Sequence, residues 1–189
     1  VVCGAPNVGK SAFISSLSTG KMEVNHYPFT TKQLHVGHFT HRRVPHQLVD
    51  TPGLLDRPMS DRNAIEMQAI AAIEHVGSLC IFLMDISESC GTSLDDQHNL
   101  LDEVKSLLPE IDIIVVVSKA DLMEPLPVNW DEVKQSESEW DGEGEPFLPI
   151  LVDEEGCVTI SATENVGVTS LRLEICLLYT SPSPRDDPL

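Results

Sequence analysis

Two kinds of apolar pattern alternate along the chain and predict the order of its secondary-structure elements. Almost every residue is apolar over residues 79–84 and 111–117, which is typical of strands buried on both faces of a sheet. Over residues 63–75 and 94–108, apolar residues recur at mostly helical spacing. Because strands and helices alternate, the pattern predicts an α/β fold with a mainly parallel sheet and helices on both faces.

The remaining elements extend this layout. Residues 33–40 and 44–49 predict two short strands separated by a pair of arginines, most simply an antiparallel hairpin at one edge of the sheet. Residues 157–160 predict the last strand, and apolar residues from 168 onward predict a closing helix. Ligands of such folds bind at the carboxyl ends of the parallel strands, so polar motifs at those ends are the candidates for a site.

The chain divides into one predicted domain, residues 1–174, and a short tail. Residue 1 already belongs to the first predicted strand, so we expect the natural protein to begin further upstream. Residues 124–155 hold eleven acidic residues against one lysine, which predicts a solvated insertion with little fixed structure. Residues 175–189 contain three prolines, resemble translated sequencing-adaptor read-through, and are left out of the fold prediction.

Charge and histidine spacing limit the partners. A net charge of −18 repels polyanions, so we expect no broad surface for nucleic acid or membrane phosphate. The longest apolar runs are too short to cross a bilayer, and no membrane partner is expected. His35, His38 and His41 recur every three residues, but a strand places His38 on the opposite face from the other two, which argues against a shared metal.

The most specific motif follows the first strand. The pattern G-x-x-x-x-G-K-S runs from Gly4 to Ser11, where glycines let backbone N–H groups approach phosphate oxygens. Lys10 supplies positive charge for the β- and γ-phosphates, and Ser11 offers a hydroxyl to Mg²⁺. The residues expected to contact the nucleotide here are Gly4, Asn7, Val8, Gly9, Lys10, Ser11 and Ala12.

A second motif, Asp-Thr-Pro-Gly, follows the strand at residues 44–49. Asp50 can hold Mg²⁺ through a water molecule, and the Gly53 N–H can meet a γ-phosphate. The alternative is a plain turn, because proline and glycine are turn formers. The loop before the hairpin can deliver a threonine hydroxyl to the metal, and we favour Thr31 over Thr30.

A third motif, Ser-Lys-Ala-Asp, follows the second buried strand and predicts the base. The Asp121 carboxylate can accept hydrogen bonds from N1–H and the 2-amino group of guanine, whereas adenine offers no such donor pair. Lys119, next to Ser118, would lay its aliphatic stem along the base and ribose. Ser161 and Ala162 follow the last strand and could present a backbone N–H to the guanine carbonyl.

Together these motifs resemble the translation-factor-related GTPases and, within them, the Obg class. Four further stretches are similar to the nucleolar GTP-binding protein 1 family: residues 27–32, 50–56, 61–70 and 84–91. The resemblance is close over residues 1–123 and weaker over 157–174.

The resemblance implies a P-loop NTPase G domain that binds GTP or GDP with Mg²⁺ and hydrolyses GTP slowly. It implies catalytic roles for Asn7, Lys10, Thr31 and Gly53, and metal ligation by Ser11, Thr31 and Asp50. It also implies a role in large ribosomal subunit assembly, with pre-60S particles bound through regions largely absent from this chain. The implied location is the nucleolus and nucleus, or the cytoplasm if the source is archaeal.

Two residues depart from the family pattern, and one suggests a further ion. Ser118 stands where the guanine motif usually has an asparagine. We expect this shorter side chain to lose a hydrogen bond to the phosphate loop, which would weaken nucleotide affinity by about 1 kcal/mol. Leu54 stands where Ras-like proteins have a water-orienting glutamine, which predicts slow intrinsic hydrolysis. Asn7 resembles an asparagine that helps hold K⁺ in related GTPases, so K⁺ is a candidate activator.

Three other functions stay open at this point. One is a binding-only scaffold for guanine nucleotides with negligible turnover, which the residues at positions 54 and 118 make plausible. Another is an Obg-class GTPase that is not tied to ribosome assembly. A P-loop kinase or ATPase is disfavoured because Asp121 suits guanine.

Overall fold

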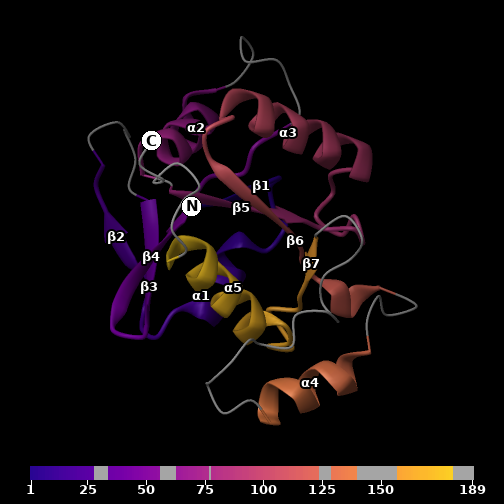
Figure 1. Ribbon diagram of the computed structural model, residues 1–189. Helices are drawn as coiled ribbons and strands as arrows, with labels where there is room; N and C mark the ends of the chain where they lie inside the picture. The colour runs from indigo at the N-terminus through magenta and orange to yellow at the C-terminus, as the bar shows by residue number, and fades with distance from the viewer. Residues whose placement is uncertain (28–33, 56–62, 77, 124–128, 140–156, 181–189) are drawn as a thin grey trace, which may run out of the picture.

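The computed structural model describes residues 1–27, 34–55, 63–76, 78–123, 129–139 and 157–180 (Figure 1). Its strands are β1 (Val2–Gly4), β2 (Glu23–Asn25), β3 (Leu34–His41), β4 (Val44–Asp50), β5 (Leu79–Met84), β6 (Asp112–Val117) and β7 (Val158–Thr159). Its helices are α1 (Lys10–Leu17), α2 (Ala64–Val76), α3 (Leu94–Leu107), the short 3₁₀ helix η2 (Ala120–Leu122), α4 (Trp130–Glu139) and α5 (Val168–Thr180).

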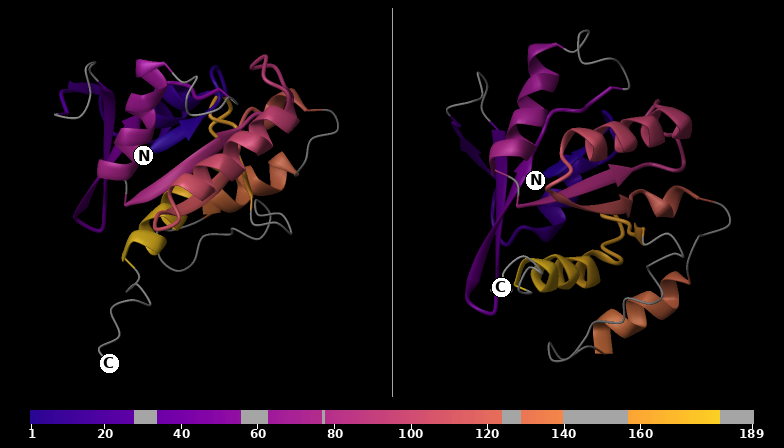
Figure 2. Two further views of the ribbon diagram at one scale, coloured as in Figure 1. Left: turned by 90° about the horizontal axis from the view of Figure 1, so that it is seen from above. Right: turned by 45° about the horizontal axis from the view of Figure 1, so that its top comes forward.

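The strands form one sheet in the order β2-β3-β4-β1-β5-β6-β7. Strand β1 pairs in parallel with β4 and β5, and β5, β6 and β7 continue the parallel part. Strands β2, β3 and β4 pair antiparallel at the other side. Helices α2 and α3 cover one face of the sheet, and α1 and α5 cover the other (Figures 1 and 2). The predicted fold class is therefore confirmed.

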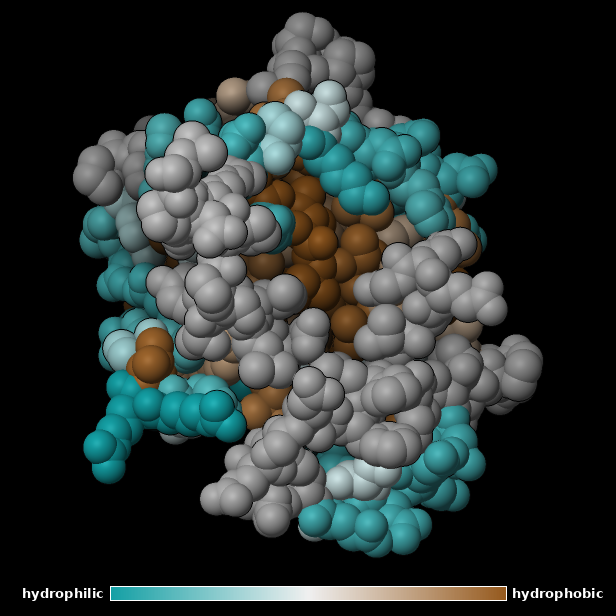
Figure 3. All heavy atoms as spheres, viewed as in Figure 1, coloured by the Kyte–Doolittle hydropathy of each residue, from teal (hydrophilic) through white to brown (hydrophobic). Residues whose placement is uncertain are grey.

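The core lies where the helices meet the sheet. All six residues of β5 are buried, as expected for a central parallel strand. On the face shown in Figure 3, apolar residues gather near the centre, and hydrophilic residues lie toward its edge. Helix α1 lies close to β3 because Gly37 has no side chain: a Cβ there would come within 2.0 Å of Ser18 Oγ and 2.6 Å of Ile14 Cγ2. Among the described residues, no helix is long and apolar enough to span a bilayer.

Two predicted loops contain regular structure. Strand β2 lies in the segment before the hairpin, which the sequence predicts to be a loop, and pairs antiparallel with the first three residues of β3. The sequence gives little sign of this strand because Glu23 and Val24 are both exposed, so no inward-facing apolar pattern marks it.

Helix α4 contradicts the prediction that residues 124–155 have little fixed structure. The Asn129 side chain accepts a hydrogen bond from the Glu132 N–H at 3.4 Å, at the start of α4. Val133 is buried in the core and Trp130 packs against it partly buried, so two apolar residues fix a helix that is otherwise polar or charged. Glu137 then accepts hydrogen bonds from the N–H groups of Gly167 and Ser170 at 3.3 and 3.2 Å, at the start of α5. The other residues of that stretch, 124–128 and 140–155, lie outside the described part.

Helix α5 continues beyond residue 174, where the predicted domain ended. Ile175 and Cys176 are buried against the core. These two residues therefore pack as part of the domain rather than of a separate tail. Residues 181–189 lie outside the described part of the chain.

Candidate functional site

The phosphate motif forms the loop between β1 and α1. Gly4 has a φ of 138°, and a Cβ at this position would lie 2.4 Å from the Leu83 carbonyl oxygen on β5. Gly9 has a φ of 100°. Asn7 also adopts a positive φ, 61°, which asparagine tolerates better than most residues. The loop therefore turns sharply above the sheet, where its backbone N–H groups can surround an anion.

Lys10 is the first residue of α1 and is almost fully buried. Its Nζ donates hydrogen bonds to the carbonyl oxygens of Ala5, at 2.8 Å, and Gly4, at 3.3 Å. Burial lowers the pKa of Lys10, and the nearby Asp50 carboxylate acts in the opposite direction. The ammonium group is thus held inside the loop, close to where the motif predicts phosphate.

A candidate cation site lies beside this loop. Ser11 Oγ donates a hydrogen bond to Asp50 Oδ2 at 2.6 Å. The other carboxylate oxygen, Asp50 Oδ1, is buried and has no hydrogen-bond partner among the described residues. A hydroxyl beside an incompletely satisfied carboxylate offers hard oxygen ligands, so the residues present fit Mg²⁺. The predicted third ligand, Thr31, lies outside the described residues, as does Thr30.

The Asp-Thr-Pro-Gly segment packs directly against the phosphate loop. A Cβ on Gly53 would lie 2.7 Å from Pro6 Cα, so only glycine allows this approach. The Leu54 N–H donates to the Gly4 carbonyl oxygen at 3.1 Å, and its side chain is fully buried. The side chain at position 54 is therefore part of the core and cannot orient a water molecule.

Two hollows adjoin at the phosphate loop. The larger, of about 490 Å³, is lined by both the loop and the Asp50 segment, and the smaller is a cavity of about 270 Å³ lined by the third motif. Gly9 and Ala12 line both. The larger hollow also contacts Asn7, Lys10, Ser11 and Asp50, and the smaller contacts Val8, Ser118, Lys119, Asp121 and Ala162. Most of the predicted phosphate and base residues thus line neighbouring spaces, although Gly4, Gly53 and Ser161 line neither of the two.

Ser118 keeps a bond to the phosphate loop, which contradicts our expectation. Its hydroxyl lies 2.7 Å from the carbonyl oxygen of Val8 and 3.0 Å from that of Met84, and can donate to either. The shorter side chain reaches the loop because Ser118 itself is buried where β6 ends, directly behind the loop. The expected loss of about 1 kcal/mol in nucleotide affinity therefore has no structural basis.

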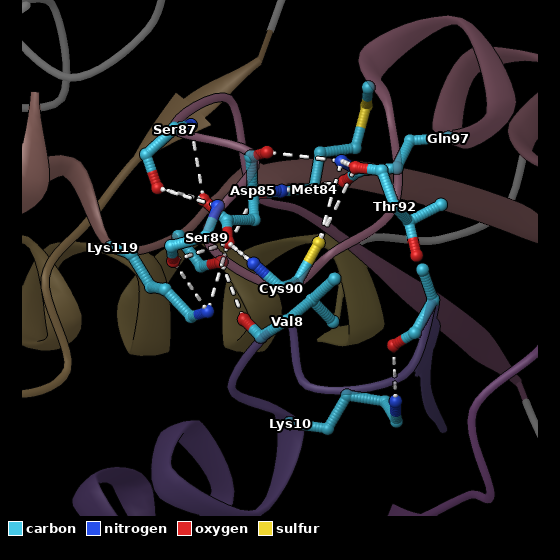
Figure 4. A network of polar contacts seen from close by, with 12 residues as sticks. Val8, Lys10, Met84, Asp85, Ser87, Ser89, Cys90, Thr92, Gln97 and Lys119 are labelled. Atoms are coloured by element: carbon cyan, nitrogen blue, oxygen red, sulfur yellow. Dashed lines mark hydrogen bonds and ion pairs between the residues drawn. The ribbon is translucent and has the colours of Figure 1, made fainter.

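Lys119 is held by a carboxylate from another loop. Its Nζ forms an ion pair with Asp85 Oδ2 at 2.9 Å and donates to Ser89 Oγ at 3.0 Å (Figure 4). Asp85 is fully buried and follows β5 directly. Its Oδ2 also accepts from the Cys90 N–H at 2.8 Å, and its Oδ1 accepts from the Ser87 N–H at 3.1 Å. The ammonium group is therefore fixed while the aliphatic stem lines the smaller cavity.

A glutamine on α3 holds the same loop. The Asp85 N–H donates to Gln97 Oε1 at 2.8 Å, and Gln97 Nε2 donates to the carbonyl oxygens of Asp85 at 3.0 Å and Thr92 at 2.9 Å. Burial raises the pKa of Asp85, but hydrogen bonds from Ser87, Lys119 and Ser89 outweigh it, so the net pKa is lowered. The carboxylate thus stays charged and keeps its ion pair.

Asp121 lies in η2, and Ser161 fixes its carboxylate by donating a hydrogen bond to Oδ1. This leaves the other carboxylate oxygen for a ligand. The Ser161 N–H donates to the Val166 carbonyl oxygen at 3.0 Å. Of the predicted pair, Ala162 is therefore the candidate for a backbone donor to a base.

Comparison with known proteins decides the family. The family model described as Nucleolar GTP-binding protein 1 matches residues 64–121. A crystal structure from Plasmodium falciparum, described as a nucleolar GTP-binding protein 1, superposes with a TM-score of 0.64 at 34% sequence identity. That match covers 94% of this chain and 83% of the Plasmodium chain. The chain belongs to the nucleolar GTP-binding protein 1 family.

Curated members of the nucleolar GTP-binding protein 1 family are much longer than this chain. The Drosophila melanogaster protein is 36% identical over 214 aligned residues, which cover 100% of this chain and 31% of that protein. The Saccharomyces cerevisiae protein is 41% identical over 138 residues, covering 73% of this chain and 21% of that protein. The chain spans about a fifth to a third of their length. The G domain of the Thermotoga maritima FeoB iron transporter, at 20% identity and a TM-score of 0.62, shares the G-domain fold.

Asp85 and Gln97 are the residues that sequence reasoning missed in this family member. The available signal was an aspartate directly after the buried strand at residues 79–84, in a stretch used only to recognise the nucleolar GTP-binding protein 1 family. Asp85, like Asp50, lies at the carboxyl end of a strand, and this position could have marked it as a site residue. Gln97 gave no signal, because a glutamine on a helix is ordinarily solvated.

Proposed function

We propose that the chain is the G domain of a protein that binds GTP and GDP with Mg²⁺ and hydrolyses GTP slowly. The observation that carries this proposal is the meeting of the two hollows at Gly9 and Ala12. One is lined by Asn7, Gly9, Lys10 and Ser11 of the phosphate motif, and the other by Asp121 and Lys119. The relatives' name, nucleolar GTP-binding protein 1, supports the same nucleotide.

In the proposed site, different residues of the phosphate side would bind the phosphates and the metal ion. Backbone N–H groups of the loop and the Lys10 ammonium would bind the phosphate oxygens, and α1 directs its positive end toward them. Ser11 and Asp50 would hold Mg²⁺, joined by Thr31, and Gly53 would donate its N–H to the γ-phosphate. Bound Mg²⁺ would neutralise charge on the phosphates and polarise the bond to be broken.

The base residues would select guanine. Asp121 is oriented by Ser161 and would accept from N1–H and the 2-amino group, for which adenine has no equivalent pair. Lys119 would lay its stem along the base because Asp85 holds its ammonium group. The Ala162 N–H would donate to the guanine carbonyl.

Turnover should be slow because no side chain at position 54 can orient the attacking water. Asn7 is exposed at the edge of the larger hollow. A cation held near it would supply the positive charge that an arginine provides in other GTPases. We therefore propose that K⁺ stimulates GTP hydrolysis. The buried Leu54 also favours a second candidate function, a binding-only scaffold with negligible turnover.

For the protein from which the chain comes, we propose a role in large ribosomal subunit assembly in the nucleolus and nucleus. Membership of the nucleolar GTP-binding protein 1 family supports this proposal. The pre-60S particle would be bound largely through regions outside this chain, since the chain matches only 31% and 21% of the length of these two curated relatives. The alternative is an Obg-class GTPase with another task.

The test is single-turnover hydrolysis of labelled GTP, with ATP as control, in matched KCl and NaCl buffers. We expect GTP binding with slow hydrolysis that KCl accelerates, and weak binding of ATP. Binding without hydrolysis would identify the scaffold, and equal acceptance of ATP would overturn the guanine site. Copurification of the intact protein with large-subunit precursors tests the ribosomal role, and its absence would leave an Obg-class GTPase of another function.

A further inference from the structure

The turn between β3 and β4 lies at the end of the sheet opposite the nucleotide site. Strand β4 begins at the turn with Val44 and ends at the site with Asp50. The hairpin projects past the helices in both views of Figure 2, and Figure 3 shows strongly hydrophilic side chains over it at the lower left. We call Arg42, Arg43, Arg172 and His41 the basic tip.

The two residues of the turn are arginines in an unfavourable backbone conformation. Arg42 and Arg43 have φ values of 46° and 68°, and both are exposed. A two-residue hairpin turn with two positive φ values favours Asn-Gly, because other residues crowd their own backbone there. Such strain persists where a side chain is needed for function. The chain thus carries two guanidinium groups where stability alone would favour neither.

A third guanidinium group is fixed beside the turn from α5. Arg172 Nη2 donates to the Thr40 carbonyl oxygen at 2.9 Å, and its guanidinium carbon lies 4.7 Å from the centre of the Phe39 ring. Residues 132 positions apart therefore contribute to one positive patch. The chain has only 12 lysines and arginines in total, and three of them meet here.

The arginines of the basic tip act electrostatically on the histidines beside them. The pKa of His41 is lowered by burial and by Arg42 and Arg172, and that of the neighbouring His46 by burial, His41 and Arg172. No carboxylate of the described residues contributes to either shift. A chain with a net charge of −18 thus has a local positive potential at this end.

We infer that the basic tip docks onto the phosphate backbone of an RNA. Guanidinium groups bind phosphate oxygens in a bidentate manner. A stable protein partner would need an apolar centre, and the described residues of the turn offer only Val44 and Pro45. The patch is narrow. It is therefore compatible with our expectation that the chain has no broad surface for nucleic acid. This inference does not depend on nucleotide binding.

The decisive variant is Arg42→Asn combined with Arg43→Gly. It removes two charges and installs the pair that the backbone prefers, so loss of RNA binding cannot be ascribed to unfolding. We expect the urea midpoint of unfolding to rise and the affinity for a fluorescein-labelled RNA stem-loop, measured by anisotropy in 50 mM KCl, to fall at least about tenfold. The dependence of log K on log salt should become shallower by about two.

The matched control is Lys105→Ala with Lys134→Ala, which removes two exposed charges elsewhere. We expect it to keep RNA affinity within about twofold, since its residues lie outside the patch. The inference is overturned if the unaltered chain does not bind the stem-loop, if both variants lose binding equally, or if a glutamate-rich peptide displaces the RNA at equal charge concentration. GTP affinity, measured on the same samples, should be unchanged and reports separately on the proposed function.

Discussion

The phosphate half and the base half of the site are built in different ways. On the phosphate side, backbone shape does most of the positioning: two glycines with positive φ set the loop, and Lys10 bonds to carbonyls five and six residues away. On the base side, side chains join distant segments, as Ser118 does over 110 positions and Lys119 over 34. A local motif can therefore specify the first half, whereas the second exists only in the folded chain.

This difference predicts that base-side variants change stability and phosphate-side variants change binding. The largest effect is expected from Asp85→Asn, which leaves Lys119 beside a neutral amide and disturbs a fully buried network. Breaking a buried ion pair by removing one partner costs about 3 kcal/mol. Urea unfolding should show this loss in the free energy of unfolding.

Asp102→Asn, on the exposed side of α3, removes the same charge and serves as the control. We expect its free energy of unfolding to stay within about 0.5 kcal/mol of the unaltered chain. Equal stabilities of the two variants would mean that the Asp85 network does not support the base half.

Lys10→Ala should give the opposite result. The ammonium group makes charge-assisted bonds worth about 1.5–3 kcal/mol to a phosphate, which corresponds to roughly a 10- to 150-fold loss of GTP and GDP affinity. Because burial already lowers the pKa of Lys10, removing this amine should cost the fold little. Isothermal titration and urea unfolding on one sample separate the two effects, with Lys105→Ala as control. Affinity equal to that of the control would remove Lys10 from the site.

Ser118 joins the two halves of the site, so its variants should change both the stability of the chain and its GTP affinity by a small amount. Ser118→Ala removes a hydroxyl bonded to the Val8 or Met84 carbonyl and should lower stability by about 1 kcal/mol and GTP affinity by about fivefold. Ser118→Asn, the usual residue of the family, should retain affinity. Titration and unfolding measure both, with exposed Ser15→Ala as control. If Ser118→Asn binds GTP at least about fivefold more tightly than the unaltered chain, our original expectation of a lost bond would be restored.

The contrast also explains what could be predicted from the sequence. Apolar runs and glycine spacing located β5, β6 and the phosphate loop, because these depend on neighbours in the chain. They did not locate β2, where Glu23 and Val24 are exposed, or α4, which the buried Val133 and hydrogen bonds that Glu137 accepts from the start of α5 help to hold in place. Those elements depend on contacts made only after folding.

The same limit applied to individual side chains of the site. The bond from Ser118 to the loop was missed because its length depends on how closely β6 approaches β1's loop, which no sequence pattern records. The Asp85 network was missed because it joins three segments through side chains. The positions of Thr30 and Thr31 lie outside the described residues, so the choice between them stays a prediction.

The smallest expected effect is an acid sensitivity of the base half that comes from Asp85. The folded chain lowers the pKa of Asp85, while the unfolded chain leaves it near the ordinary value of about 4. Between these two values the unfolded state binds more protons, so the stability that Asp85 contributes is complete above about pH 4 and is lost as the pH falls through the folded pKa. The stability advantage of the unaltered chain over Asp85→Asn should therefore shrink as the pH is lowered from 6 to about 3.5. Urea unfolding across this range measures this difference in the free energy of unfolding, with Asp102→Asn as reference. A constant advantage at every pH would show that the charge of Asp85, and so its ion pair with Lys119, does not contribute to stability.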